Sequence, residues 1–200
     1  MEPVRVVSGT AAPLDRADVD TDQIIPSEWL KRIERTGFGD GLFSEWRQDP
    51  DFVLNDENYA GASVLLAGSN FGIGSSREHA VWALVDYGFR AVVSERFGDI
   101  FRNNATRSGL VPATVAPGAV RVLLDAAIAN PRLLVTIDVE RRVVSASEIG
   151  LEAPFTLDDE ARERLLRGLD DIGITLEYED AIARFERSRP SHLPSLTRRS

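Results

Sequence analysis

Residues 62–87 read ASVLLAGSNFGIGSSREHAVWALVDY, and the order of features within them sets the fold class. The first of these features, residues 63–67, is a short apolar run typical of a strand that is buried on both faces. A loop with three glycines follows, and from residue 76 to 87 apolar side chains recur at helical spacing until Gly88 ends the helix. A strand, a glycine-rich loop and a helix in this order form one unit of an α/β protein.

The same alternation continues towards the C-terminus. The pattern predicts strands at residues 90–94, 110–115, 133–139 and 142–145, and helices at 97–108 and 120–130. Before residue 62, glycines and prolines interrupt the pattern, so only a strand at 4–7 and short helices at 27–35 and 42–47 are predicted. We expect an α/β fold built on a mostly parallel sheet with flanking helices.

The C-terminal region has a different pattern. From about residue 155 a helical extension is predicted, which begins at the capping residues Asp158 and Asp159, and a last helix is predicted at 175–187. The sequence from 188 to 200 is rich in proline, serine and arginine, and we expect it to be a disordered tail. One domain over residues 1–187 is therefore expected.

Composition excludes several classes of function. The 200 residues include 32 acidic and 23 basic side chains, a net charge of -9, and such a chain repels the phosphates of nucleic acids. The sequence shows neither a secretory signal nor an apolar run long enough to cross a membrane, so a cytoplasmic location and no membrane contact are expected. It has no cysteine, which excludes disulfides and metal sites held by thiolates of this chain.

The loop at residues 68–77 is the main candidate for a functional site. A glycine-rich loop between a strand and a helix directs backbone N–H groups, and the positive end of the helix dipole, towards one place, where an anion binds well. Arg77 adds a planar guanidinium suited to a carboxylate or a phosphate. The loop lacks the third small residue of a dinucleotide site, the lysine of a P-loop and the G-x-S-x-G motif of a hydrolase.

Two residue patterns in the chain also have purely structural interpretations. Ser75 and Glu78 have the spacing of a helix capping box, and Ser76 is the alternative cap if Ser75 faces a ligand. Three carboxylates at Asp18, Asp20 and Asp22 lack the glycine and the closing glutamate of a calcium loop, so turn and cap roles are expected for Asp20 and Asp22.

Three motifs together resemble the C-terminal swivelling domain of the aconitase superfamily. They are DTDQIIP at residues 20–26, GIGSSREHA at 72–80 and RFGDIFRNN at 96–104. With GLDDIG at 168–173, the chain is most similar to the family of bacterial 3-isopropylmalate dehydratase small subunits. The resemblance covers about residues 4–185 and implies a flattened β/β/α barrel-like domain.

The resemblance also implies a reaction and a partner. In this family a hydro-lyase of leucine biosynthesis, which is a heterodimer, converts 2-isopropylmalate to 3-isopropylmalate by loss and return of water, through isopropylmaleate. A [4Fe–4S] cluster acts as the Lewis acid. Because this chain has no cysteine, the cluster is expected on a large catalytic subunit, and the chain alone is expected to be inactive.

By the same resemblance, Ser75 is the general base and Arg77 holds a carboxylate of the dicarboxylate substrate. Ser76 is expected to bind substrate as well, and further substrate-binding residues are expected in two other segments. Thr21 and Asp22 lie in the first motif. The specificity loop supplies Leu30 or Ile33 for the isopropyl group, and Lys31 or Arg32, which face either a carboxylate or solvent.

Two alternatives stay open at this point. One keeps the superfamily but changes the substrate, which makes the chain the small subunit of a homoaconitase or of a methylcitrate-type hydro-lyase. The other is a non-catalytic regulatory module that binds an anion and joins no catalytic partner, because a fold does not by itself imply a function.

Overall fold

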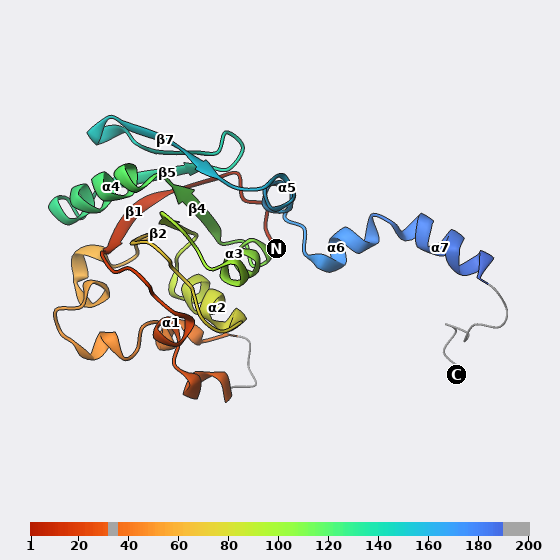
Figure 1. Ribbon diagram of the computed structural model, residues 1–200, viewed down its shortest axis with the longest axis horizontal. Coiled ribbons are helices and arrows are strands. Elements are labelled where there is room, and N and C mark those ends of the chain that lie inside the picture. The colour runs from red at the N-terminus through yellow and green to blue at the C-terminus, as the bar shows by residue number, and fades with distance from the viewer. Residues whose placement is uncertain (32–35, 190–200) are drawn as a thin grey trace.

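The structure, a computed structural model, describes residues 1–31 and 36–189. Seven strands form a closed barrel in the order β1-β2-β3-β4-β7-β6-β5 (Figure 1). The strands are β1 (Val6–Leu14), β2 (Val64–Ala67), β3 (Ala91–Ser94), β4 (Val111–Val115), β5 (Leu134–Asp138), β6 (Val143–Ala146) and β7 (Leu151–Thr156). The barrel with flanking helices confirms the expected α/β class.

The strand pairing is mixed. The pairs β1–β2, β2–β3 and β3–β4 are parallel, as the sequence pattern predicts, whereas the other four pairs are antiparallel. The long strand β1 closes the barrel because its first half pairs with β5 and its second half with β2. A mostly parallel sheet therefore describes only the half formed by β1 to β4.

Two strand predictions need correction. Strand β1 runs to Leu14 rather than ending at residue 7, although Gly9 and Pro13 are turn formers. The sequence pattern does not predict strand β7, because Pro154 and the polar positions around it suggest the entry to a helix. In the structure Ala153 and Phe155 are buried between exposed neighbours, which is the alternation of a strand with one buried face.

The helices agree better with the sequence pattern after residue 75 than before it. They are α1 (Thr21–Ile24), α2 (Glu78–Tyr87), α3 (Asp99–Arg107), α4 (Pro117–Ala129), α5 (Asp159–Arg167), α6 (Asp171–Leu176) and α7 (Glu179–Ser188). The helices predicted at 27–35 and 42–47 are only short 3₁₀ turns where described, η1 (Ser27–Lys31) and η3 (Trp46–Gln48). Phe43 has a φ of 48°, which stops a regular helix there.

Two buried clusters lie on the two faces of the parallel strands. Val64 and Leu66 of β2 belong to one cluster with strands β4 to β7 and helices α4 and α5, while Leu65 and Ala67 belong to the other. The second cluster also contains α2 and the long connection between β1 and β2, through fully buried side chains such as Phe38 and Phe43. This packing fixes the connection that carries α1 against the loop before α2.

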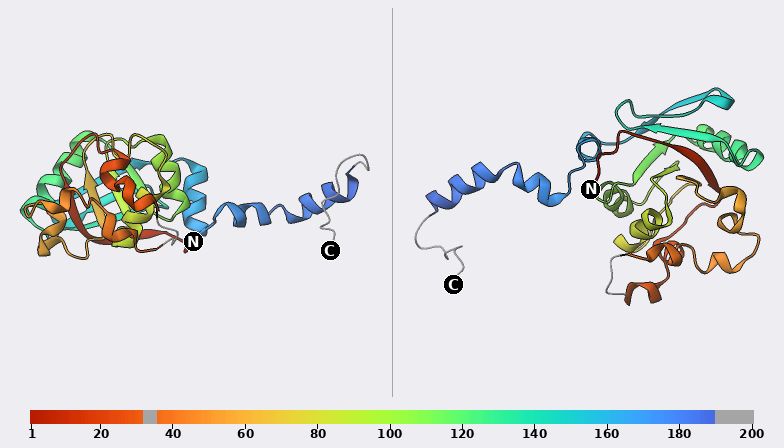
Figure 2. Two further views of the ribbon diagram at one scale, coloured as in Figure 1. Left: turned by 90° about the horizontal axis from the view of Figure 1, so that it is seen from below. Right: turned by 180° about the vertical axis from the view of Figure 1, so that it is seen from behind.

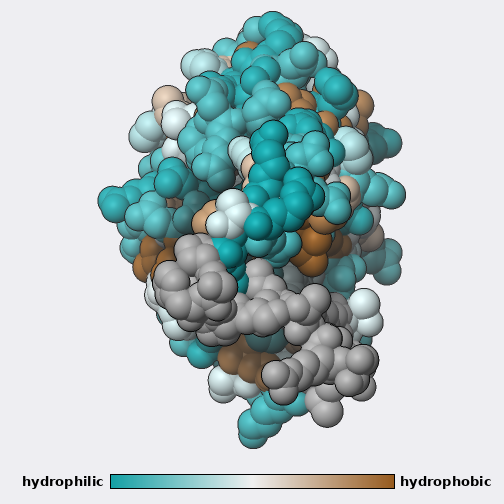
Figure 3. Space-filling model, turned by 90° about the vertical axis from the view of Figure 1, so that its right-hand side faces the viewer, coloured by the Kyte–Doolittle hydropathy of each residue, from teal (hydrophilic) through white to brown (hydrophobic). Residues whose placement is uncertain are grey.

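Helices α6 and α7 form an arm that projects away from the barrel (Figures 1 and 2). No residue of α7 is buried, and the arm exposes large apolar side chains at Ile172, Leu176, Tyr178 and Phe185. Seen from the side of the arm, the surface is mainly hydrophilic with separate hydrophobic patches (Figure 3). Most of the predicted tail, residues 190–200, lies outside the described part of the chain. Within that part, no helix is both long and apolar enough to cross a membrane.

Candidate active site

Two segments about fifty residues apart form the site. The backbone N–H of Gly72 donates to the carbonyl of Val19 at 2.7 Å, and that of Thr21 donates to the carbonyl of Ile73 at 2.9 Å. A parallel bridge also pairs Asp20 with Ile73. The first and second sequence motifs are therefore held side by side, so that the start of α1 lies against the glycine-rich loop.

Glycine is required at two positions of this loop. Gly72 has a φ of +72°, and a Cβ there would lie 2.3 Å from Cγ of Phe101, so a side chain clashes with the aromatic core. Gly74 has a φ of +93°, and a Cβ there would lie 3.4 Å from Cβ of Asp20. The left-handed backbone at Gly74 turns the chain so that the next residue, Ser75, meets α1.

Ser75 is exposed and pairs with Thr21. Its Oγ lies 3.2 Å from Oγ1 of Thr21, and its carbonyl oxygen accepts a hydrogen bond from that same Oγ1 at 3.0 Å. The predicted capping box of Ser75 and Glu78 is wrong, because α2 begins at Glu78 with Arg77 as its N-cap and no side chain caps it. The N–H of Arg77 donates instead to the carbonyl of Ser75 at 2.9 Å, which delays the helix.

The capping box of this region belongs to α1. Oδ1 of Asp20 accepts from the N–H of Gln23 at 2.9 Å, and Oε1 of Gln23 accepts from the N–H of Asp20 at 2.9 Å. This reciprocal pair satisfies two backbone donors at the start of the helix. The cap role expected for Asp20 is confirmed, and it places Thr21 and Asp22 in the first turn of α1.

Arg77 links the loop to α1 through charge. Its guanidinium forms an ion pair with Asp22 and donates to the carbonyl of Ile25 at 3.3 Å. The Arg77 side chain is only 17% exposed, whereas that of Asp22 is 60% exposed. The guanidinium is therefore held in one orientation by two partners on α1 and its C-terminal end, while Asp22 remains open to solvent. Ser76, which lies between Ser75 and Arg77 in the chain, is exposed.

A cavity of about 390 Å³ opens beside this ion pair and is lined by Asp22, Gln23, Pro26, Ser27, Glu28, Glu45 and Arg77. Its lining has three carboxylates and one guanidinium. Glu45 is absent from the sequence prediction, because its approach depends on the path of the long connection and no local motif marks it. A second cavity, of about 510 Å³, is lined by residues 72–74 of the same loop and by residues 96–100 of the third motif.

The predicted specificity loop is only partly described. Leu30 is half-buried and Lys31 is exposed, both on η1, whose first residues Ser27 and Glu28 line the cavity beside Arg77. The other two residues predicted for this loop, Arg32 and Ile33, lie outside the described residues.

The side chains of the described residues do not build a metal centre. The sequence contains no cysteine, and among residues 1–31 and 36–189 no three histidine or acidic side chains are grouped in a way that fits a metal ion. The residues of this chain therefore do not fit the ligand set of an iron–sulfur cluster, which is built from thiolates.

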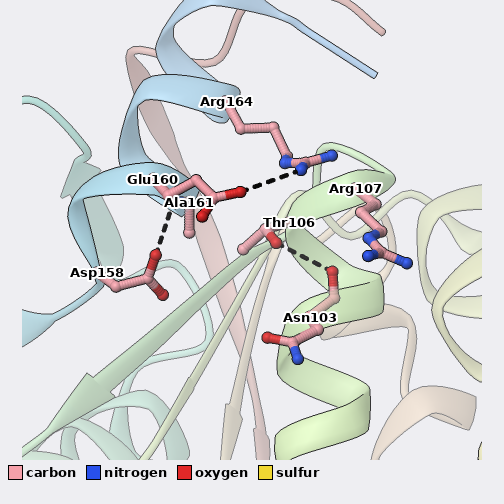
Figure 4. Close-up of a pocket in the computed structure, with 7 residues that line it drawn as sticks. All are labelled: Asn103, Thr106, Arg107, Asp158, Glu160, Ala161 and Arg164. Atoms are coloured by element: carbon pink, nitrogen blue, oxygen red, sulfur yellow. Dashed lines mark hydrogen bonds and ion pairs between the residues drawn. The ribbon is translucent and has the colours of Figure 1, made fainter. Parts of the chain in front are cut away.

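A smaller cavity of about 200 Å³ lies between α3 and α5, away from α1 (Figures 1 and 4). Around it, Arg164 pairs with Glu160 at 3.6 Å, and Thr106 Oγ1 donates to the carbonyl of Asn103 at 3.0 Å. The cavity is lined by two acidic and two basic side chains, so its charges balance, and none of the predicted site residues is among its lining residues. The candidate active site is therefore the junction of α1 with the glycine-rich loop.

Comparisons with known proteins agree over nearly the whole chain. A family model described as the aconitase C-terminal domain matches residues 1–118, and one described as the C-terminal domain of the 3-isopropylmalate dehydratase small subunit matches residues 171–199. A 3-isopropylmalate dehydratase small subunit of Frankia alni is 60% identical over 195 residues, which cover 98% of this chain and 99% of that protein. One of Rubrobacter xylanophilus is 58% identical over 194 residues, covering 97% and 98%.

A solved structure gives the same fold. The crystal structure of 3-isopropylmalate dehydratase from Methanocaldococcus jannaschii matches with a TM-score of 0.66 and 23% sequence identity. The match covers 90% of this chain and 98% of that chain. At this identity the likeness supports the architecture alone.

Proposed function

Since the chain belongs to the family of 3-isopropylmalate dehydratase small subunits, we propose that it supplies the general base and one carboxylate-binding group of an active site completed by a large subunit. It is a subunit of a hydro-lyase of leucine biosynthesis. Family membership sets aside a homoaconitase, a methylcitrate-type hydro-lyase and a lone regulatory module. A cytoplasmic location is part of the proposal and is supported by this biosynthetic role.

Ser75 is the proposed base. Removal of a carbon-bound proton needs a group that is open to the substrate. Ser75 is exposed and does not cap α2, and although it lines neither cavity, it lies in the chain between Gly74, which lines one, and Arg77, which lines the other. Arg77, two residues later, is the proposed partner of a substrate carboxylate, because a guanidinium donates two parallel hydrogen bonds to such a group. Base and carboxylate site would then be fixed relative to each other by one short loop.

The charge of the cavity argues for a completed, two-subunit site. Three carboxylates, Asp22, Glu28 and Glu45, line it against the single guanidinium of Arg77, so a dicarboxylate would meet repulsion from this chain alone. Asp22 is proposed to orient Arg77. The missing positive charge is proposed to come from the large subunit and from Lys31 or Arg32.

The other specificity residues belong to the same proposal. Leu30 or Ile33 would contact the isopropyl group, and Ser76 would assist substrate binding. We further propose that a [4Fe–4S] cluster belongs to the large subunit and, when bound, supplies a Lewis acid for the departing hydroxyl group. This chain contributes no ligand to it, and its share of the reaction is to bind, to orient and to move the carbon-bound proton.

The experiment is anaerobic reconstitution with the large subunit, followed by the absorbance of isopropylmaleate. Ser75→Ala is expected to lower kcat by roughly 10²- to 10⁴-fold, the usual contribution of a general base. Ser147→Ala, which removes an exposed hydroxyl at η6 (Ser147–Ile149), is the matched control and should leave kcat unchanged. A Ser75→Ala enzyme that is folded, assembled and fully active would refute the proposed base.

A further inference from the structure

We infer that Thr21 is a positioning residue that acts through Ser75 and does not itself bind substrate. Its hydroxyl holds Ser75 in place, and it donates a hydrogen bond to the Ser75 oxygen whenever that oxygen has lost its proton. The inference rests on the proposed role of Ser75 as the base. It changes the expectation for Thr21, which the family resemblance groups with the substrate-binding residues.

Burial separates Thr21 from the substrate. Thr21 is 2% exposed, although its neighbour Asp22 and its partner Ser75 are both exposed. Its backbone is also fixed, because its N–H donates to Ile73 at 2.9 Å and its carbonyl accepts from Ile25 at 3.1 Å. Thr21 therefore offers almost no surface to a substrate, whereas its Oγ1 lies 3.2 Å from Ser75 Oγ.

The hydrogen count of the two hydroxyls gives Thr21 its role. Each hydroxyl has one hydrogen and two lone pairs. With Ser75 protonated, Thr21 uses its single hydrogen on the Ser75 carbonyl at 3.0 Å, which leaves Ser75 as the donor in the 3.2 Å contact between the two hydroxyls. With Ser75 as the alkoxide, rotation of the Thr21 hydroxyl turns the same hydrogen to Ser75 Oγ. One hydrogen thus serves two acceptors that belong to one residue.

The proton balance closes over a full turnover. In dehydration the Ser75 alkoxide takes the proton from carbon, the C–H electron pair forms the double bond, and the hydroxyl group leaves with its own bonding pair as hydroxide, towards the Lewis acid proposed for the large subunit. In rehydration hydroxide adds to the neighbouring carbon, and the electron pair of the double bond takes the proton from the Ser75 hydroxyl, which becomes the alkoxide again. Thr21 would change its acceptor at each of these two transfers.

The glycine-rich loop brings the pair together. A Cβ at Gly74 would lie 3.7 Å from Oγ1 of Thr21, so the loop passes over the threonine in close contact. The capping box of Asp20 and Gln23 fixes the start of α1 from the other side. Because both segments are anchored by backbone hydrogen bonds, the distance between the two hydroxyls is set before the substrate arrives.

The test compares Thr21→Val, which keeps the shape but removes the hydroxyl, with Thr21→Ser, which keeps the hydroxyl, in the reconstituted enzyme. Thr21→Val is expected to lower kcat by about 10- to 100-fold, as for the loss of a hydrogen bond to a charged group, with little change in KM. The deuterium isotope effect, measured with substrate labelled at the carbon that loses its proton, should rise. Thr21→Ser should restore kcat to within about 3-fold of the wild-type value.

Thr106→Val is the matched control. It removes a hydroxyl that is also almost fully buried and also donates to a backbone carbonyl, but on α3. It should leave kcat and the isotope effect unchanged. Melting temperatures and hydrogen exchange over residues 73–78 of the isolated small subunit show whether each variant folds. If Thr21→Val does not assemble, Thr21→Ala is measured in the same way.

The outcomes separate this inference from the proposed function. If Ser75→Ala loses activity but Thr21→Val keeps the wild-type kcat and isotope effect, the inference about Thr21 is wrong and Ser75 remains the proposed base. An increase in KM with unchanged kcat in Thr21→Val would also overturn the inference, because it would show that Thr21 binds substrate. If Ser75→Ala is fully active, the proposed base fails first. Equal residual rates for Ser75→Ala and for the double variant Ser75→Ala with Thr21→Val would support action through Ser75.

Discussion

Individual residues of the glycine-rich loop carry the proposed chemistry, and backbone conformation and polar contacts hold them. Ser75 and Ser76 are exposed, whereas the mostly buried Arg77 side chain is held by Asp22 and by the carbonyl of Ile25. The positive φ of Gly74 therefore decides the position of Ser75, because it turns the chain towards α1.

Substitution at Gly74 tests this dependence. Gly74→Ala forces an L residue into a left-handed conformation and is expected to lower the free energy of unfolding by about 1–2 kcal/mol. We expect kcat of the reconstituted enzyme to fall at least 10-fold, since the Ser75–Thr21 pair is displaced. Denaturant unfolding and steady-state kinetics measure the two effects.

Gly61→Ala is the control for backbone strain. Gly61 has a φ of +77°, a Cβ there would have nothing within 4 Å, and the residue lies before β2, outside the site. The two variants should lose similar stability, but Gly61→Ala should keep its activity. Equal activity in both variants would show that the turn at Gly74 does not position Ser75.

Sequence reasoning succeeded for residues that are neighbours in the chain. Ser75 and Arg77 could be assigned to one loop because three glycines and a helix pattern surround them. The bond between Thr21 and Ser75 could not be predicted, because the two residues are 54 positions apart and no periodicity reports a contact across such a distance. Glu45 was missed for the same reason.

Short elements depend on their caps. The four-residue helix α1 has one capping box, formed by Asp20 and Gln23, and its first turn carries both Thr21 and Asp22. A helix this short has no independent stability, so its cap and its packing maintain it. The longer α5 is also capped by an aspartate, Asp158, which accepts from the N–H of Ala161 at 2.8 Å.

These two caps give a matched pair of variants. Asp20→Ala and Asp158→Ala should each lower the free energy of unfolding by about 1 kcal/mol, the usual effect of losing an N-cap. Only Asp20→Ala is expected to reduce kcat, because α1 holds the partner of Ser75. Urea unfolding and reconstituted activity measure both; a loss of activity in Asp158→Ala would contradict the localisation of the site.

Elements were predictable where packing and local pattern agree. The buried runs of β2, β3 and β4, and the helices that follow β2 and β3, combine strong apolar patterns with clear glycine stops. Strand β7 was not predictable, because Pro154 is tolerated there by an antiparallel pairing that only the closed barrel supplies. Before residue 62, the conformation of the chain depends more on packing in the aromatic core than on local helix or strand propensity.

At the scale of the whole molecule, the chain divides into a packed barrel and a projecting arm. Helix α5 belongs to the barrel, since Leu165 is fully buried and its carbonyl accepts from the N–H of Val4 at 2.8 Å. Beyond Gly168, Glu177 of the arm forms an exposed ion pair with Arg167, the last residue of α5. Such a pair adds little stability.

Truncation after Asp170 tests this division and the domain predicted over residues 1–187. The shortened chain should keep a cooperative thermal transition within a few degrees of that of the full chain, because the removed helix α7 buries no side chain. Circular dichroism and calorimetry of the isolated small subunit are the measurements. A broad transition, or a fall of more than about 8 °C, would show that the arm belongs to the same folding unit.

The closure of the barrel by β1 has a consequence for a protein that is made as one half of an enzyme. Within the described residues, every barrel strand has a hydrogen-bonded neighbour on each side, and even the shortest pairing, β4 with β7, joins Thr114 to Thr156 and Val115 to Phe155, so no strand presents a wholly unpaired edge to another copy of the chain. A small subunit made in excess of its partner therefore has few free backbone groups through which copies could join strand to strand, and closure of the barrel disfavours that route to aggregation.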